Sequence, residues 1–428
     1  MHWLEGLFSV CMLTGCILGT VNTRLSLTLP FAVALLLTAC TSPDAAPDAG
    51  GAGDTANVAQ SAHEQEEMDE PPTPQQLAAA EAEELWQSWD TRAQAASLLV
   101  LHYPGSDAQA TQSFLETVAP AGLILMGDNV PDPEDALEEQ TRRWQEAAES
   151  ARLPPLVISI DQEGGLVKRL LGDTNVGAGD LRDGDPEAVA EAFRKRGGYL
   201  SRLGVNVNFG IVADYTDDPG SFIYDRVLGT TSSSAAAAVQ AAVEGEREGG
   251  SGAVHSTVKH FPGHGLTPGD SHQIIPDCGD ITQEEWAETA AVPFEAGISS
   301  GTSLVMMSHI SCPRIAQGPA SLQAKWYEVL RDDLGFDGVI VTDDMSMLTN
   351  SGEEPFADPG ANAVGAIKAG ATLVLSIGGE DGAAATIYAQ GLVDAVVAAV
   401  ESGEIPAEVF HDAGIRALIF RQGLSPQF

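Results

Sequence analysis

Eight short apolar runs, rich in valine, isoleucine and leucine, recur along the chain with room for a helix between most of them. They cover residues 97–103, 122–127, 156–160, 205–212, 256–260, 303–309, 338–342 and 372–377. Amphipathic helical patterns lie between or after them, for example over 133–150, 186–203, 282–297 and 384–402. This alternation predicts an α/β fold, and near-continuous apolar strands are typical of a sheet buried on both faces. We therefore predict a TIM-like (β/α)8 barrel, formed as one domain by residues 85–428. An open doubly wound sheet is the alternative that the pattern leaves open.

Residues 1–39 have the features of an export signal. The apolar run "LTLPFAVALLLTAC" ends at Cys40 and has small residues before it, as a signal peptide has before its cleavage site. The run is short of the roughly 20 residues that a membrane-spanning helix needs, although an uncleaved anchor is the alternative. The final cysteine resembles a bacterial lipobox, which predicts cleavage before Cys40 and lipidation of its thiol. Translation could begin at Met1 or at Val21.

Residues 40–84 are predicted to form a disordered acidic tether. They are rich in alanine, glycine, proline, aspartate and glutamate and contain no lysine or arginine, so they have little apolar surface to bury. The whole chain carries a formal net charge of −40, which disfavours nucleic acid or an anionic surface as a partner. We expect an exported monomer held on the outer side of the cytoplasmic membrane, or in the cell envelope, only by its lipid anchor.

The predicted domain contains two cysteines, Cys278 and Cys312. They could form a disulfide in an oxidising compartment, or remain as two buried thiols. No spacing of cysteine and histidine resembles a zinc site, so we expect no metal.

Charged and imidazole side chains follow five of the predicted strands. The segments are "DQEGG" (161–165), "ADYTDD" (213–218), "KHFPGHGLTPGDSH" (259–272), "SHI" (308–310) and "TDDMSM" (342–347). In a (β/α)8 barrel the loops that follow the strands meet at one rim, where active sites are found. These segments are therefore predicted to form a single site.

The motifs "SIDQEGGLVKRL", "LGVNVNFGIVAD", "YDRVLG", "VKHFPGHG…DSH" and "LGFDGVIVTDDMSM" resemble the signatures of glycoside hydrolase family 3. More narrowly, they resemble its single-domain β-N-acetylglucosaminidases of the NagZ type. The resemblance implies a retaining exo-acting enzyme that removes terminal GlcNAc from peptidoglycan-derived cell-wall glycans such as GlcNAc–MurNAc, without a cofactor.

Three residues are predicted to be catalytic. Asp343 follows a β-branched run directly, where a carboxylate can attack an anomeric carbon and form a glycosyl-enzyme. Its neighbour Asp344 should point the other way and be structural. Asp270 and His272 lie two residues apart, on the same side of an extended segment, so the carboxylate can orient the imidazole as general acid and base. The resemblance assigns the same roles.

The resemblance also assigns substrate binding to five residues, Asp161, Arg169, Arg226, Lys259 and His260. Ordinary ion pairs within a barrel are the alternative for each of them. His264 is expected to stabilise its loop and not to contact the sugar.

Two departures from the family pattern are visible: Leu166 stands where arginine is common, and "YDRVLG" replaces "GDRSFG". Neither removes a proposed catalytic residue. Two further functions stay open, namely phosphorolysis of β-N-acetylglucosaminides, since a neutral imidazole would not repel phosphate, and a catalytically silent glycan-binding lipoprotein.

Overall fold

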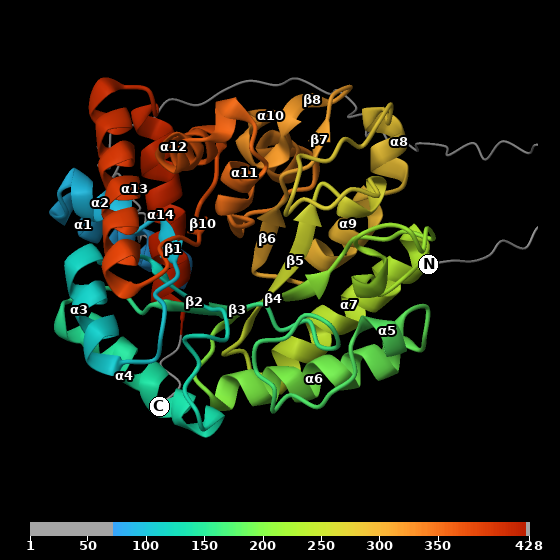
Figure 1. The fold of residues 1–428 in the computed structure, drawn as a ribbon, viewed down its shortest axis with the longest axis horizontal. Coiled ribbons are helices and arrows are strands. Elements are labelled where there is room, and N and C mark those ends of the chain that lie inside the picture. The colour runs from blue at the N-terminus through green and yellow to red at the C-terminus, as the bar shows by residue number, and fades with distance from the viewer. Residues whose placement is uncertain (1–71, 425–428) are drawn as a thin grey trace, which may run out of the picture. The chain divides into compact units, whose positions relative to one another are not determined.

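The computed structural model describes residues 72–424, so the predicted signal peptide, Cys40 and most of the tether lie outside the described residues. Eight parallel strands form one sheet in the order β10-β1-β2-β3-β4-β5-β6-β9 (Figure 1). Their bounds are β1 (Leu99–Leu101), β2 (Gly122–Leu125), β3 (Val157–Ile160), β4 (Val207–Val212), β5 (His255–Phe261), β6 (Leu304–Met307), β9 (Val339–Thr342) and β10 (Val374–Ser376). Each strand falls within or over one of the eight apolar runs.

A parallel bridge between Val341 of β9 and Leu373 joins the two ends of the sheet. The backbone N–H of Thr342 donates to the carbonyl of Leu373 over 3.1 Å, and that of Thr372 donates to Ile340 over 2.8 Å. These bonds close the sheet into a barrel, so the TIM-like prediction is confirmed and the open doubly wound sheet is excluded.

Helices surround the barrel (Figure 1). The longer ones are α1 (Pro74–Ser88), α3 (Ala108–Val118), α4 (Leu137–Ser150), α6 (Pro186–Arg202), α7 (Ser232–Gly249), α9 (Ala291–Ser299), α12 (Pro359–Ala369), α13 (Gly382–Ser402) and α14 (Ala407–Gln422). Shorter helices are α2 (Thr91–Ala96), α5 (Ala178–Leu181), α8 (Gln283–Glu288), α10 (Ala324–Glu328) and α11 (Ser346–Asn350). Strands β7 (Ser311–Cys312) and β8 (Ala316–Pro319) form a separate antiparallel pair.

The helix predicted over 282–297 is broken into α8 and α9. Pro293, near the start of α9, has no N–H to donate to the carbonyl four residues earlier, at Thr289, and its ring would clash with that carbonyl. Thr289 accordingly leaves the helical conformation, with φ −130° and ψ −81°.

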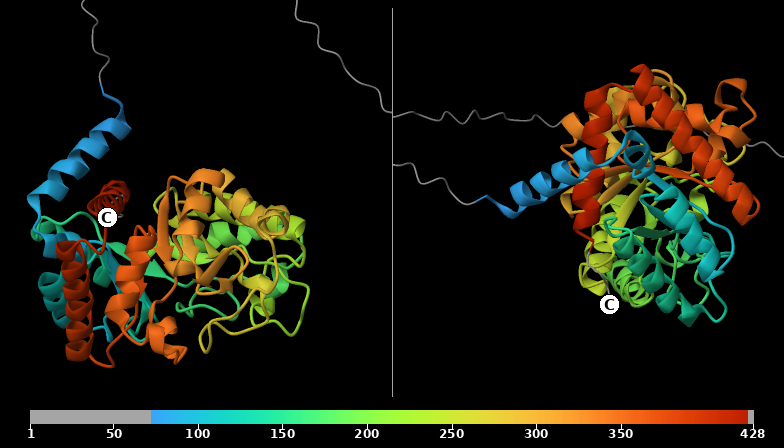
Figure 2. Two further views of the ribbon diagram at one scale, coloured as in Figure 1. Left: turned by 90° about the horizontal axis from the view of Figure 1, so that it is seen from above. Right: turned by 90° about the vertical axis from the view of Figure 1, so that its left-hand side faces the viewer.

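The predicted tether is wrong over its last part, because residues 74–84 belong to α1. Thr73 caps this helix through a capping box with Gln76, and its buried Trp86 packs edge-on against Phe410 of α14 with ring centroids 5.1 Å apart. A side chain at Gly414 would lie 2.2 Å from the Trp86 ring, so this ring packs directly against the backbone of α14. Figure 2 shows α1 extending from the body of the domain.

Cys278 and Cys312 form a disulfide, which settles the choice left open by the sequence. The bond joins the segment after β5 to β7. A backbone hydrogen bond from Cys278 N–H to the Ser311 carbonyl, 2.9 Å, lies beside it. The long loop after β5 is therefore covalently attached to the loop after β6.

Among residues 72–424, α13 alone is long and apolar enough to cross a membrane by length and composition. It packs against α12, α2 and α3 and is one of the helices that surround the barrel.

Removing the Trp86 side chain should weaken the attachment of α1. We expect Trp86→Ala to lower the free energy of unfolding by about 3–5 kcal/mol, because a large buried ring is lost. Leu77→Ala, on the same helix but 49% exposed, is the matched control and should change it by less than about 1 kcal/mol. Equal losses in denaturant titrations would contradict the packing of α1 described above.

Candidate active site

A cavity of about 460 Å³ opens at the carboxyl ends of the barrel strands. It is lined by residues that follow β2, β3, β5, β9 and β10, together with the loop after β4. Every residue predicted for catalysis or sugar binding except Asp270 lines it, namely Asp161, Arg169, Arg226, Lys259, His260, His272 and Asp343. The barrel thus brings together side chains from distant parts of the sequence.

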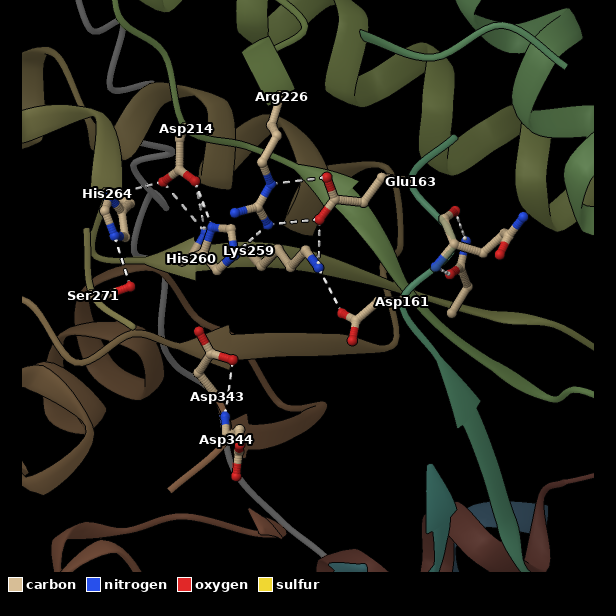
Figure 3. A network of polar contacts seen from close by, with 12 residues as sticks. Asp161, Glu163, Asp214, Arg226, Lys259, His260, His264, Ser271, Asp343 and Asp344 are labelled. Carbon is tan, nitrogen blue, oxygen red and sulfur yellow. Dashed lines mark hydrogen bonds and ion pairs between the residues drawn. The ribbon is translucent and has the colours of Figure 1, made fainter. Parts of the chain in front are cut away.

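A buried ion network lies along one side of this cavity (Figure 3). Lys259 of β5 donates to Asp161 and to Glu163, 2.8 Å in each case. Arg226 binds Glu163 through two nitrogens, at 2.7 and 3.1 Å. Burial alone would lower the pKa of Lys259, but the fields of Asp161 and Glu163 outweigh it and raise that pKa. Both cations therefore stay charged in a desolvated place.

Glu163 is the central anion of this network, and sequence reasoning missed it. Its side chain is buried, which would raise its pKa, yet Arg226 and Lys259 together hold the pKa far below the ordinary value of 4.5. A usable signal was present, because Glu163 follows Asp161 by two residues at the end of a strand. Such residues share a side.

Arg169 lies at the edge of the same network, 3.6 Å from the second oxygen of Asp161. Its Nε is buried and has no hydrogen-bond partner among the described residues. Arg169 as a whole lines the cavity, so its other guanidinium nitrogens are the ones that could donate to a sugar hydroxyl.

His260 connects the ion network to a buried carboxylate, Asp214. The Nδ1 of His260 is 2.6 Å from Asp214, and its Nε2 is 3.1 Å from an arginine nitrogen of Arg226. Since arginine can only donate, Nε2 must accept, and Nδ1 carries the hydrogen that is donated to Asp214. Burial, followed by the nearby cations, lowers the pKa of His260 and keeps it neutral.

Asp214 was not singled out from the sequence, although the segment "ADYTDD" was. Burial raises the pKa of Asp214 to about 6, although the hydrogen bonds donated to it stabilise the ionised carboxylate and oppose this rise.

Asp343 stands directly after β9, on the opposite side of the cavity from the ion network (Figure 3). Its backbone N–H donates to the Met307 carbonyl over 2.7 Å, which places it beside β6. Burial would raise the pKa of this carboxyl, but the polar groups around it, among them the charged Lys259 and the backbone N–H of Asp344, lower that pKa below its ordinary value. The carboxylate is therefore ionised and available as a nucleophile.

His309, in the flagged segment "SHI", supports the nucleophile side of the cavity. It contacts Ser321 Oγ at 2.7 Å through Nδ1 and donates from Nε2 to the Asp344 carbonyl at 2.9 Å. These two bonds fix the chain where it turns away from β9.

Asp344 points away from Asp343 (Figure 3). Its Oδ1 accepts from the backbone N–H groups of Ser346 and Ile377 at 3.0 and 2.9 Å. Burial raises its pKa to about 6. These bonds join the loops after β9 and β10, as expected of a structural residue.

The Asp270–His272 pair forms as predicted. Nδ1 of His272 is 2.9 Å from Asp270 Oδ1, which also accepts the backbone N–H of His272. Burial would raise the pKa of Asp270, but these two hydrogen bonds and a third from Gln273 lower that pKa. The His272 side chain is 56% exposed, and with Nδ1 held by Asp270, Nε2 is the nitrogen left for proton exchange.

Leu166, one of the two departures from the family pattern, lines the cavity and is 74% exposed. An apolar side chain therefore stands at the mouth of the site where arginine is common.

A larger cavity of about 650 Å³ lies between α1, α4 and α14. It includes residues 152–155, which precede β3, and therefore belongs to the amino-terminal end of the barrel, where conserved features serve stability and not catalysis. In the described part of the chain, no group of three or more His, Cys, Asp or Glu residues could hold a metal ion.

The model of the glycosyl hydrolase family 3 N-terminal domain matches residues 80–419 of this chain. The chain belongs to glycoside hydrolase family 3. The family resemblance seen in the motifs is thereby confirmed, and the chain is a glycoside hydrolase.

Individual relatives agree with this assignment. Over 267 residues the chain is 33% identical to a β-hexosaminidase of Xylella fastidiosa, covering 60% of this chain and 76% of that enzyme. It is 29% identical over 359 residues to a secreted glycosyl hydrolase of Arthroderma benhamiae, covering 82% and 98%. Among solved structures, a family 3 β-N-acetylglucosaminidase of Paenibacillus sp. superimposes with a TM-score of 0.71 at 31% identity. That match covers 78% of this chain and 63% of the Paenibacillus enzyme.

Replacing Glu163 should unbalance the buried network. We expect Glu163→Gln to lower the free energy of unfolding by about 3–5 kcal/mol at neutral pH, because Lys259 and Arg226 lose their shared anion. The depressed pKa of Glu163 stabilises the fold above the ordinary value of 4.5, and this contribution is lost as the pH falls below it. The difference between variant and wild type should therefore shrink below that pH.

Denaturant titrations at about pH 7 and about pH 3.5 measure this effect. Glu139→Gln, which removes an exposed glutamate paired with Arg142 and Arg143, is the control and should cost less than about 1 kcal/mol. A pH-independent difference between Glu163→Gln and wild type would count against the proposed charge balance.

Proposed function

We propose that this protein is a retaining exo-β-N-acetylglucosaminidase that acts through a covalent glycosyl-enzyme. The observation that carries the proposal is the presence in one cavity of an ionised Asp343 carboxylate and of His272, whose Nδ1 is held by Asp270. A nucleophile and a general acid that can become a general base are the two groups that this reaction needs.

In the first step an oxygen of Asp343 attacks the anomeric carbon, and the bond from that carbon to the leaving oxygen breaks. Protonated His272 gives its Nε2 proton to the leaving oxygen, so the aglycone departs as an alcohol. Asp270 stabilises the imidazolium and keeps the ring oriented. The products are a glycosyl ester on Asp343 and a neutral His272.

In the second step His272 takes a proton from water through Nε2, and the water oxygen attacks the anomeric carbon. The ester bond to Asp343 breaks, and the sugar leaves with its original configuration. The acid is an imidazole, so the usual separation of two carboxyl groups in retaining enzymes does not apply.

The paired ions along the cavity suit a neutral sugar rich in hydroxyl groups. Asp161 can accept from hydroxyls, and Arg169 and Lys259 can donate to them. Three cations, Arg169, Arg226 and Lys259, share the two carboxylates of Asp161 and Glu163, so the network keeps an excess of one positive charge, which the ionised Asp343 can balance.

The relatives and the sequence support the proposed substrate and location. The names of the Xylella and Paenibacillus enzymes support terminal β-linked GlcNAc, and the predicted lipidation at Cys40 supports a GlcNAc–MurNAc fragment of the cell wall as the natural substrate. The secreted Arthroderma relative supports export.

Asp343 should carry the covalent intermediate. A 2-fluoro or 5-fluoro GlcNAc donor is expected to label Asp343, and Asp343→Ala should reduce hydrolysis of a chromogenic GlcNAc glycoside by about 10⁴-fold or more. Asp332→Ala, at an exposed position, should leave the rate unchanged. Mass spectrometry that finds the label on another carboxylate, or an active Asp343→Ala enzyme, would refute the mechanism. No turnover by the wild type would favour a glycan-binding role.

Phosphate should not replace water in the second step. Four carboxylates line the cavity, Asp161, Asp225, Asp343 and Asp344, and the cations beside them are already paired, so a phosphate dianion gains little there. We expect the release of GlcNAc to be independent of phosphate concentration at constant ionic strength. Formation of GlcNAc-1-phosphate, detected by ³¹P NMR, would instead establish phosphorolysis.

A further inference from the structure

The loop that carries the acid/base pair is held by the loop after β4. Asp214, 1% exposed, follows β4 and accepts the backbone N–H of His264 over 2.6 Å. The same carboxylate binds His260 (Figure 3). One buried group therefore fixes both a member of the sugar-binding network and the start of the acid/base loop.

His264 extends this connection to the catalytic pair. Its Nε2 is 2.9 Å from Ser271 Oγ (Figure 3), and Ser271 stands between Asp270 and His272 in the chain. Both partners are buried, with 1% of His264 and 4% of Ser271 exposed. His272 itself is largely exposed, so the buried bond one residue away limits where its ring can lie.

Packing supports the same arrangement. A side chain at Gly265 would lie 1.9 Å from the Tyr215 carbonyl, so the two loops are in direct contact. The Phe222 ring contacts both imidazoles, with centroids 5.6 Å from His264 and 5.4 Å from His272. The backbone N–H of Phe222 donates to the Pro268 carbonyl over 3.2 Å.

We infer that Asp214 and the His264–Ser271 hydrogen bond are positioning elements that hold the Asp270–His272 pair where it can protonate the leaving group. None of the three needs to touch the substrate for this role. The inference rests on the proposed function, because it takes His272 as the general acid. It also gives His264 a more specific task than general loop stability.

Leaving-group dependence separates positioning of the acid from general damage. From a 2,4-dinitrophenyl GlcNAc glycoside the leaving group departs as the dinitrophenolate anion and needs no proton. From chitobiose the leaving group is a sugar oxygen, which needs a proton from the acid. We expect Ser271→Ala to lower kcat/KM for chitobiose by about tenfold, since displacement of a catalytic group is costly, and to leave the dinitrophenyl substrate nearly unchanged. His272→Ala should show the same selectivity with a loss of about 10²-fold or more. In both variants azide should accelerate turnover of the dinitrophenyl substrate, because it needs no general base.

Ser303→Ala is the matched control. Ser303 forms a similar bond, 2.9 Å to His255 Nδ1, at the other end of β5, and its loss should not alter the ratio of the two kcat/KM values. Ser271→Thr keeps the hydroxyl and should retain activity toward chitobiose. If Ser271→Ala shows no cooperative unfolding transition, and is therefore not folded, His264→Asn replaces it. The asparagine side chain is too short to reach Ser271, so the same selective loss on chitobiose is expected.

Equal loss on both substrates, or no loss on chitobiose, would overturn the inference. The inference would also be overturned if the Ser271→Ala/His264→Asn double variant lost kcat/KM for chitobiose by the product of the two single losses. Substitutions of two partners in one hydrogen bond should not have independent effects. Failure of the proposed function looks different, because the wild-type enzyme would then cleave neither substrate.

Discussion

The site depends on the neutralisation of Glu163 inside the barrel. This carboxylate is desolvated by the strands around it, and a lone buried charge would cost several kcal/mol. Lys259 from β5 and Arg226 from the loop after β4 offset that cost. The two cations in turn need an anion between them, because they would otherwise repel each other. The segment after β3, the loop after β4 and strand β5 are thus linked by charge in addition to their hydrogen bonds and packing.

The nucleophile uses the same charges in another way. The charge of Lys259 helps to lower the pKa of Asp343 although this carboxyl is buried, and the neutral His260 lies near the same carboxyl. Their own positions are fixed by partners on the far side, Asp161 for Lys259 and Asp214 for His260. Lys259, which is proposed to hold the sugar, therefore also helps to keep the proposed nucleophile ionised, while the proposed proton donor stands apart on an exposed loop.

Much of this could be predicted from the sequence. The eight apolar runs predicted the barrel because parallel strands are apolar on both faces. The positions of Asp343 and Lys259 near the ends of two such runs predicted that they lie at one rim. Glu163, Asp214 and His309 were missed as individual residues. Their roles depend on which neighbours the closed barrel brings to within about 3 Å, and such distances between remote segments do not follow from spacing along one segment.

The boundary of the domain was missed for a related reason. Residues 74–84 are polar and rich in alanine and glutamate, which by composition suits a tether. The helix that contains them is attached through buried side chains, chiefly Trp86, which packs against Gly414 and Phe410 of the facing helix. Composition averages over a segment, whereas attachment depends on single contacts.

The disulfide between Cys278 and Cys312 connects the state of the active site to the place where the chain folds. One end of the long loop after β5 is fixed by strand pairing and the other by this bond. In a reducing cytosol such crosslinks do not persist. A chain that matured there would hold the loop of the proposed proton donor by noncovalent contacts alone, among them the Asp214–His264 and His264–Ser271 hydrogen bonds. Crossing a membrane into an oxidising space would thus complete the fold as well as deliver the enzyme.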